Sequence, residues 1–273
     1  MNNFISTELT HRVVTATILL MAVLTAIFYL PPIGFALFVA AVMLLAAWEW
    51  VYLSGYRSIG ARCLYTSFLV VCLWGIRYVP AIWVFYLSSL MGGTLVIYMA
   101  CLVTRSTLPQ GMRLITSGLG CVSLSLCWQS LCILSVVPAY LGLGLLVIWL
   151  TDTLAYFVGR AWGKHPLASL ISPRKSWEGL FAGLLSPVLT SIIGVRYCEL
   201  SGSAACALFA ILFLTSIVAI AGDLLESLMK RQQHLKDSGQ LLPGHGGILD
   251  RIDSLIVAIP VFTAGLYGLQ LLP

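Results

Sequence analysis

The sequence predicts an all-α fold, a polytopic transmembrane helix bundle with about nine spans and a cytoplasmic N-terminus. Of its 273 residues, 60% are hydrophobic and only 9% are charged, and the mean hydropathy is +0.99. Soluble domains carry roughly a quarter charged residues, so this chain has too little polar surface to cover a water-soluble globule. Apolar runs long enough to cross a bilayer recur along the whole chain.

The individual elements follow from these apolar runs. The first span is expected at 13–30 and the second at 33–53, with the turn signal Pro31-Pro32 between them. The further spans are expected at 63–79, 82–103, 114–136, 139–161, 178–197, 203–230 and 253–271. The run at 203–230 is longer than a bilayer needs, so its helix should extend into water at one end.

The distribution of Lys and Arg predicts the orientation. With the N-terminus in the cytoplasm, only Arg77 and Arg196 of the 15 Lys and Arg residues fall on the outer side. The other 13 lie in cytoplasmic segments, and this bias supports an odd number of spans with the C-terminus outside. Topology therefore accounts for the net charge of +5, and no nucleic acid partner is expected.

The chain is expected to form one integral-membrane domain, 1–273. The N-terminal part, 1–136, supplies spans with short cytoplasmic loops. The C-terminal part, 137–273, supplies spans and two long cytoplasmic segments, Arg160–Gly179 and Lys230–Asp253. These two segments are expected to carry the chemistry.

Acidic residues gather around the two segments. Seven of the ten in the chain lie in or beside them: Asp237, and the six candidates Asp152, Glu178, Asp223, Glu226, Asp250 and Asp253. Ionisable groups inside a span are costly, which favours a function for them. Asp152 and Asp223 should lie at similar depth, roughly 12 and 10 Å from the cytoplasmic ends of their helices. We expect the carboxylates to converge on a pocket open to the cytoplasm; the alternative is that they pair with Lys and Arg and brace the bundle.

Both segments also hold groups suited to phosphate. Ser172–Ser176 combines two cations and two hydroxyls beside a proline, and Lys230, Arg231 and Lys236 add three cations. The run Gly244–Gly247 lets the backbone approach a phosphate closely. Arg and Lys bind phosphate oxygens, and carboxylates bind the Mg²⁺ that accompanies nucleotides. The pattern favours a site for a nucleotide triphosphate with its metal.

The stretch from Ser227 to Asp253 resembles the signature of the phosphatidate cytidylyltransferase family, also called CDP-diacylglycerol synthases. The matching positions are Ser227, Lys230, Arg231, Lys236, Asp237, His245, Gly246, Gly247, Asp250, Arg251 and Asp253. The segments starting at Asp152 and at Ile171 also resemble the family, although Ser176 stands where Thr is more usual. The first half resembles the bacterial members in the stretches PPIGFAL and AAWEW.

The resemblance implies the reaction of CTP with phosphatidate to give CDP-diacylglycerol and pyrophosphate, in phospholipid biosynthesis. It implies Mg²⁺, with a second cation left open, held by Asp223 and Asp250 and with Asp152 as a third candidate. The catalytic candidates are Lys230, Arg231, His245 and Asp253. The substrate-binding candidates are Ser172, Arg174, Lys175, Lys236, Gly246, Gly247 and Arg251.

The implied partners are CTP, phosphatidate and membrane lipid, and formation of a homodimer is left open. The implied location is the bacterial inner membrane, with the active site facing the cytoplasm. His245 is expected to position phosphate rather than to act as a base, because a phosphomonoester is already anionic near neutral pH.

Three other functions compete with this interpretation. A transporter or channel would need polar access on both sides, but the predicted outer half has only Arg77, Arg196 and Glu199 as formal charges. A CDP-alcohol phosphotransferase would carry D-G-x-x-A-R followed by spaced aspartates, which we do not find in the sequence. A non-catalytic scaffold would leave the chemistry of the two loops unexplained.

Overall fold

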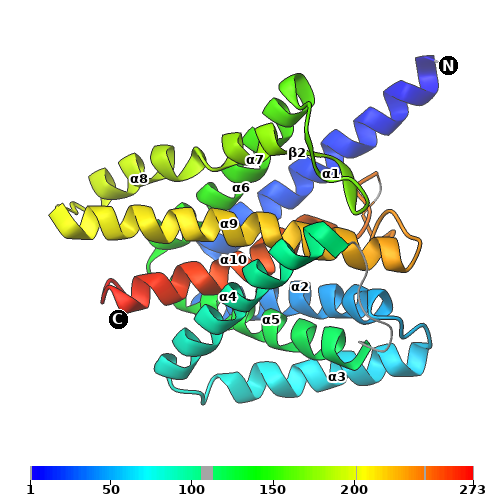
Figure 1. The fold of residues 1–273 in the computed structure, drawn as a ribbon. Helices are drawn as coiled ribbons and strands as arrows, with labels where there is room; N and C mark the ends of the chain where they lie inside the picture. The colour runs from blue at the N-terminus through cyan, green and yellow to red at the C-terminus, as the bar shows by residue number, and fades with distance from the viewer. Residues whose placement is uncertain (1, 106–112, 201, 243, 273) are drawn as a thin grey trace.

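The computed structural model describes residues 2–105, 113–200, 202–242 and 244–272, and helices dominate this part of the chain (Figure 1). The first six helices are α1 (Asn2–Tyr29), α2 (Pro32–Leu53), α3 (Ile59–Ile76), α4 (Ala81–Arg105), α5 (Arg113–Leu134) and α6 (Pro138–Trp162). The strands β1 (Pro166–Ala168) and β2 (Ser172–Ser176) follow, and then α7 (Trp177–Gly183), α8 (Ser186–Tyr197), α9 (Gly202–Gln232) and α10 (Leu249–Gly268).

Every predicted span coincides with helical structure. Within the described residues, six helical stretches are long and apolar enough to cross a membrane: Pro32–Leu53, Ile59–Ile76, Arg113–Leu134, Pro138–Trp162, Trp177–Tyr197 and Gly202–Gln232. Val14–Tyr29 within α1 and Ile82–Tyr98 within α4 are shorter apolar helical stretches. The chain therefore has the helices of a polytopic membrane protein, while the count of nine spans and the orientation stay predictions.

Two features differ from the prediction of an uninterrupted, purely helical bundle. The run expected as one helix at 178–197 is divided into α7 and α8, and Pro187 lies in the first turn of α8, where its missing N–H costs nothing. The loop before it contains an antiparallel hairpin, in which Pro166 pairs with Ser176 and Ala168 with Ser172. Periodicity cannot detect strands this short, because five residues hardly distinguish a strand from a loop.

Helix α10 lies at the centre of the bundle and packs against α9, α4, α5 and α6. Its residues from Ile256 to Phe262 are all buried, as expected of a helix that is apolar on every side. Because α9 leads into a loop and α10 returns alongside it, the end of α9 and the start of α10 meet at one end of the bundle (Figure 1). The hairpin packs against α9 at this end, so the two segments singled out from the sequence are brought together.

Candidate active site

A cavity of about 810 Å³ opens between α6, the hairpin, α7 and α9. Two carboxylates, Asp152 and Asp223, lie in its wall. Its basic and hydroxyl lining consists of Arg160, Arg174, Lys175, Tyr156, Ser172 and Ser176. The cavity therefore combines the acidic and the cationic groups that a metal-bound triphosphate requires.

The hairpin is held over the cavity by close packing of α6 and α7. Ser176 ends β2 and caps α7, because its Oγ accepts the backbone N–H of Gly179 at 3.1 Å. A Cβ on Gly179 would lie 2.6 Å from the carbonyl oxygen of Ala155 on α6, so only glycine permits this approach. The cap and the glycine contact place Lys175, immediately before them, against α9.

The first of two carboxylate clusters consists of Asp152, Asp223 and Asp253, and Lys175 contacts it. Its Nζ lies 2.6 Å from Oδ2 of Asp223. Asp223 also repels both Asp152 and Asp253, and Lys175 attracts both, so the three carboxylates share one electrostatic environment. Ser254 Oγ lies 3.5 Å from Asp152 Oδ1 and connects α10 to α6. The structure thus brings these three acids together from three helices, but only Asp152 and Asp223 line the cavity, so convergence on one pocket open to the cytoplasm stays a prediction.

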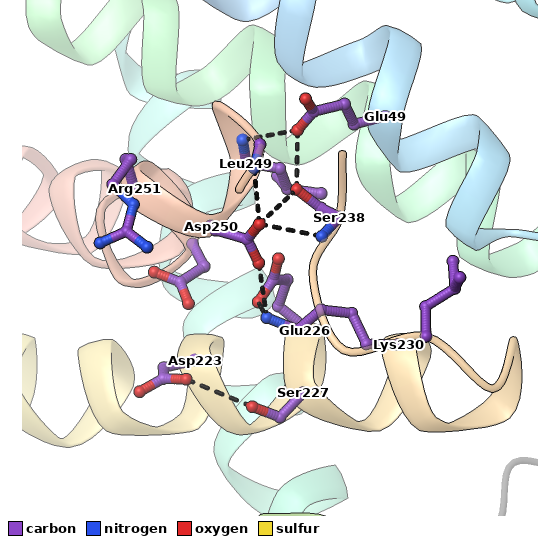
Figure 2. Close-up of polar contacts among 12 residues, drawn as sticks. Glu49, Asp223, Glu226, Ser227, Lys230, Ser238, Leu249, Asp250 and Arg251 are labelled. Atoms are coloured by element: carbon purple, nitrogen blue, oxygen red, sulfur yellow. Dashed lines mark hydrogen bonds and ion pairs between the residues drawn. The ribbon is translucent and has the colours of Figure 1, made fainter. Parts of the chain in front are cut away.

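The second cluster surrounds Asp250, at the first turn of α10 (Figure 2). Lys230 pairs with Glu226 on its own helix and reaches Asp250 Oδ1 at 2.7 Å. The other oxygen, Oδ2, accepts the backbone N–H groups of Ser238 at 2.9 Å and Gly247 at 2.8 Å, and the Ser238 hydroxyl at 3.0 Å. Asp250 thus ties the end of α9 to the glycine run that precedes α10.

The three carboxylates predicted to bind metal therefore lie in two different places. Asp152 and Asp223 line the cavity, whereas Asp250 is not part of its lining and belongs to the neighbouring network. Glu226 repels both Asp250 of the second cluster and Asp253 of the first. The two clusters therefore interact electrostatically through Glu226. A cation between Asp223 and Asp250 would have to compete with Lys175 for the first and with Lys230 for the second.

The remaining basic candidates take different places. The Arg231 guanidinium donates to the carbonyl oxygens of Ile171 and Leu235, which fastens the hairpin to the loop after α9. Arg251 donates to the carbonyl of His245 at 2.8 Å, and Lys236 is exposed on the same loop. Arg174 is exposed and lines the cavity, where it can reach a phosphate.

The glycine run has the geometry that its sequence suggested. Gly244 and Gly246 have φ angles of 74° and 82°, a region that favours glycine. His245 lies between them, and its Nδ1 is buried without a hydrogen-bond partner among the described residues. An unpartnered buried nitrogen is costly, so this atom is suited to contact a polar group of a substrate.

Glu49 lies in the second cluster, although it was not among the residues predicted from the sequence. This residue of α2 is buried, and its carboxylate accepts the Ser238 hydroxyl and the backbone N–H groups of Ile248 and Leu249. The signal was present in the sequence, since an acid inside the apolar run AAWEW is an intramembrane ionisable group.

The donor set fits Mg²⁺ that is bound together with a nucleotide. Across the described ranges, no three His, Cys, Asp or Glu side chains are grouped as a complete metal centre. Mg²⁺ usually takes only one or two protein carboxylates and completes its shell with water and substrate phosphates. Asp152 and Asp223 in the cavity wall can supply those carboxylates, beside cations that can hold the phosphates.

Comparisons with known proteins agree with this chemistry. A protein of Pseudomonas aeruginosa named phosphatidate cytidylyltransferase is 40% identical over 264 residues, which cover 95% of this chain and 97% of that protein. A Haemophilus influenzae protein of the same name is 33% identical over 283 residues, covering 93% and 97%. A Staphylococcus epidermidis protein of that name is 42% identical over 125 residues, covering 45% and 46%.

The family comparison covers nearly the whole molecule. The match to the cytidylyltransferase family extends over residues 10–268 and so includes both carboxylate clusters, the hairpin and the helices that carry them. From this match and the two relatives aligned over almost their full length, the chain belongs to the cytidylyltransferase family.

Proposed function

We propose that this protein is a phosphatidate cytidylyltransferase, which converts CTP and phosphatidate to CDP-diacylglycerol and pyrophosphate. The observation that carries the proposal is the cavity, where Asp152 and Asp223 face Arg174 and Lys175 at one end of an apolar bundle. Relatives that align over almost the whole chain bear the name of this activity.

The reaction joins two anions. A phosphate oxygen of phosphatidate forms a bond to the α-phosphorus of CTP, the bond between the α- and β-phosphates breaks, and pyrophosphate leaves. The attacking phosphomonoester has a second pKa near 6 and is already anionic near neutral pH, so no strong base is required. The main task of the protein is to neutralise and align the phosphates.

The residues of the cavity divide this task. Arg174 and Lys175 hold phosphate oxygens, with Ser172 donating from the same strand. Asp223 and Asp152 would hold Mg²⁺ on the cavity side, and Asp250 would support this set from the neighbouring cluster. When bound, Mg²⁺ supplies charge neutralisation and a fixed geometry for the triphosphate.

The residues between the end of α9 and the start of α10 support the site from the second cluster. Lys230 holds Glu226 and Asp250 in place. His245 contacts phosphate through its unpartnered Nδ1, and Gly246 and Gly247 allow the chain to approach it closely. Arg231, Lys236 and Arg251 add positive charge at the end of α9, on the loop after it and at the start of α10, and Asp253 adds negative charge to the cluster around Asp223.

The position of the cavity suits substrates from two phases. We propose nine spans, a cytoplasmic N-terminus and a site that faces the cytoplasm of a bacterial inner membrane. CTP then enters from water, and the acyl chains of phosphatidate stay in the lipid. The strong bias of Lys and Arg to one side of the predicted topology supports this arrangement.

The test is synthesis by the purified protein. Radiolabelled CTP, phosphatidate and Mg²⁺ are expected to give a nucleotide that extracts with lipid, and EDTA should abolish the product until Mg²⁺ is restored. Absence of product across several detergents and divalent metals would overturn the proposal.

A further inference from the structure

The second carboxylate cluster depends on a residue from the opposite half of the chain. Glu49 is 5% exposed, and its Oε2 accepts the Ser238 hydroxyl at 2.7 Å and the Leu249 N–H at 2.8 Å. Its Oε1 lies 3.2 Å from the N–H of Ile248. The first N–H groups of a helix have no partner within the helix, and α10 has no local side-chain cap. Glu49 therefore caps α10 from α2.

The surroundings of this carboxylate are shaped to fit it. A Cβ added to Gly239 would collide with Glu49 Oε1, and one added to Gly247 would collide with Oε2 and with Ser238 Oγ. The two glycines thus leave room for the Glu49 carboxylate and for the Ser238 hydroxyl that it accepts. A negative charge at the N-terminus of α10 is also favourable electrostatically.

The network leads directly from Glu49 to Asp250. Ser238 contacts both carboxylates, because its Oγ lies 2.7 Å from Glu49 and 3.0 Å from Asp250. Gly247, which encloses Glu49, donates its N–H to Asp250 Oδ2. Figure 2 shows Glu49 and Asp250 on either side of Ser238. Movement of Glu49 would therefore move the groups that orient Asp250.

We infer that Glu49 is a positioning residue of the active site, which fixes Asp250 and the glycine run in their working orientation. The inference rests on the proposed function in assigning Asp250 to the metal and phosphate chemistry. A role limited to stability would affect unfolding, whereas a positioning role also affects how the site uses Mg²⁺. Changes to such outer partners typically cost about 10- to 100-fold in metal affinity or activity.

The experiment compares Glu49→Gln with the unchanged protein in detergent. The substitution replaces one accepting carboxylate oxygen with an NH₂ group, which can only donate. The neighbouring groups, the Ser238 hydroxyl and the N–H groups of Ile248 and Leu249, also donate, so at least one of these hydrogen bonds is lost. We expect faster amide hydrogen exchange at Ile248 and Leu249, and unchanged exchange in the hairpin at 172–176. We also expect the Mg²⁺ concentration for half-maximal synthesis to rise about tenfold or more.

Two further variants separate positioning from general loosening of α2. Trp128→Phe removes the bond from its Nε1 to the carbonyl of Ala36, which anchors α2 to α5 away from the site, and should leave the Mg²⁺ dependence unchanged. Ser238→Ala removes the bridge between the carboxylates and should shift the Mg²⁺ dependence in the same direction as Glu49→Gln. This variant carries the test if Glu49→Gln does not fold.

Unchanged exchange at Ile248 and Leu249, or an unchanged Mg²⁺ dependence in folded Glu49→Gln, would overturn the inference. An equal shift in Trp128→Phe would also overturn it. If the unchanged protein makes no CDP-diacylglycerol, the proposed function fails. The exchange comparison needs no substrate and still decides whether Glu49 holds the start of α10.

Discussion

Asp223→Asn should separate catalysis from stability. The structure predicts a large loss of turnover and only a small change in the free energy of unfolding. Asp223 pairs with Lys175, and their side chains are 30% and 25% exposed. Partly exposed pairs contribute about 1 kcal/mol or less. Lys175 Nζ itself is buried, but Asp152 and Asp253 still attract it after the substitution. The substitution also removes repulsion from Asp152 and Asp253, which offsets the loss. The free energy of unfolding should therefore change by less than about 1 kcal/mol.

The effect on turnover should be much larger. Asn keeps the size of the side chain but removes the negative charge that would hold Mg²⁺ against the triphosphate. Loss of one preorganised electrostatic group at a reacting centre typically costs about 10²- to 10³-fold in rate, or about 2.7–4 kcal/mol. We expect turnover to fall at least a hundredfold while the protein stays folded.

The assay measures synthesis at several Mg²⁺ concentrations beside thermal unfolding in detergent. Glu199→Gln is the matched control, because it also removes one negative charge but lies after α8, outside the cavity lining and both carboxylate clusters. Near-normal turnover in well-folded Asp223→Asn would refute the metal assignment of this residue. A large loss of stability with normal activity per folded molecule would assign it to bracing the bundle.

Three further changes test other parts of the site. Lys175→Ala should raise the KM for CTP or phosphatidate about tenfold with less than about 1 kcal/mol of destabilisation, and unchanged kinetics for both substrates would contradict the phosphate role. Gly247→Ala should destabilise the protein by about 1–3 kcal/mol and reduce synthesis, because the new Cβ would collide with Glu49 and Ser238. Its control is Gly118→Ala, where a Cβ meets nothing within 4 Å, and equal effects of the two changes would refute the steric reasoning. A reporter fused to the C-terminus should signal from the outside, and a cytoplasmic signal from a stable fusion would mean that the span count is wrong.

The helices were predictable because their cause is local. In lipid, every backbone polar group must find a partner within the protein, so an apolar run of sufficient length becomes a helix. This is why the predicted spans coincide with helices from α1 to α10. The division of 178–197 was not predicted, because the apolar run continues through the break and only Pro187 marks it.

The sequence by itself determined the membrane class, the helices and the residue types of the site, since spacing along a helix brings Asp223 and Glu226 to one face. Only the tertiary structure decided how these groups are shared between the two clusters, with Asp223 in the cavity wall and Asp250 in the adjoining network. It also decided the role of Glu49, whose partners lie 189 to 200 residues further along the chain. A carboxylate's partner at that separation is set by the packing of α2 beside the start of α10, and no local pattern contains that information.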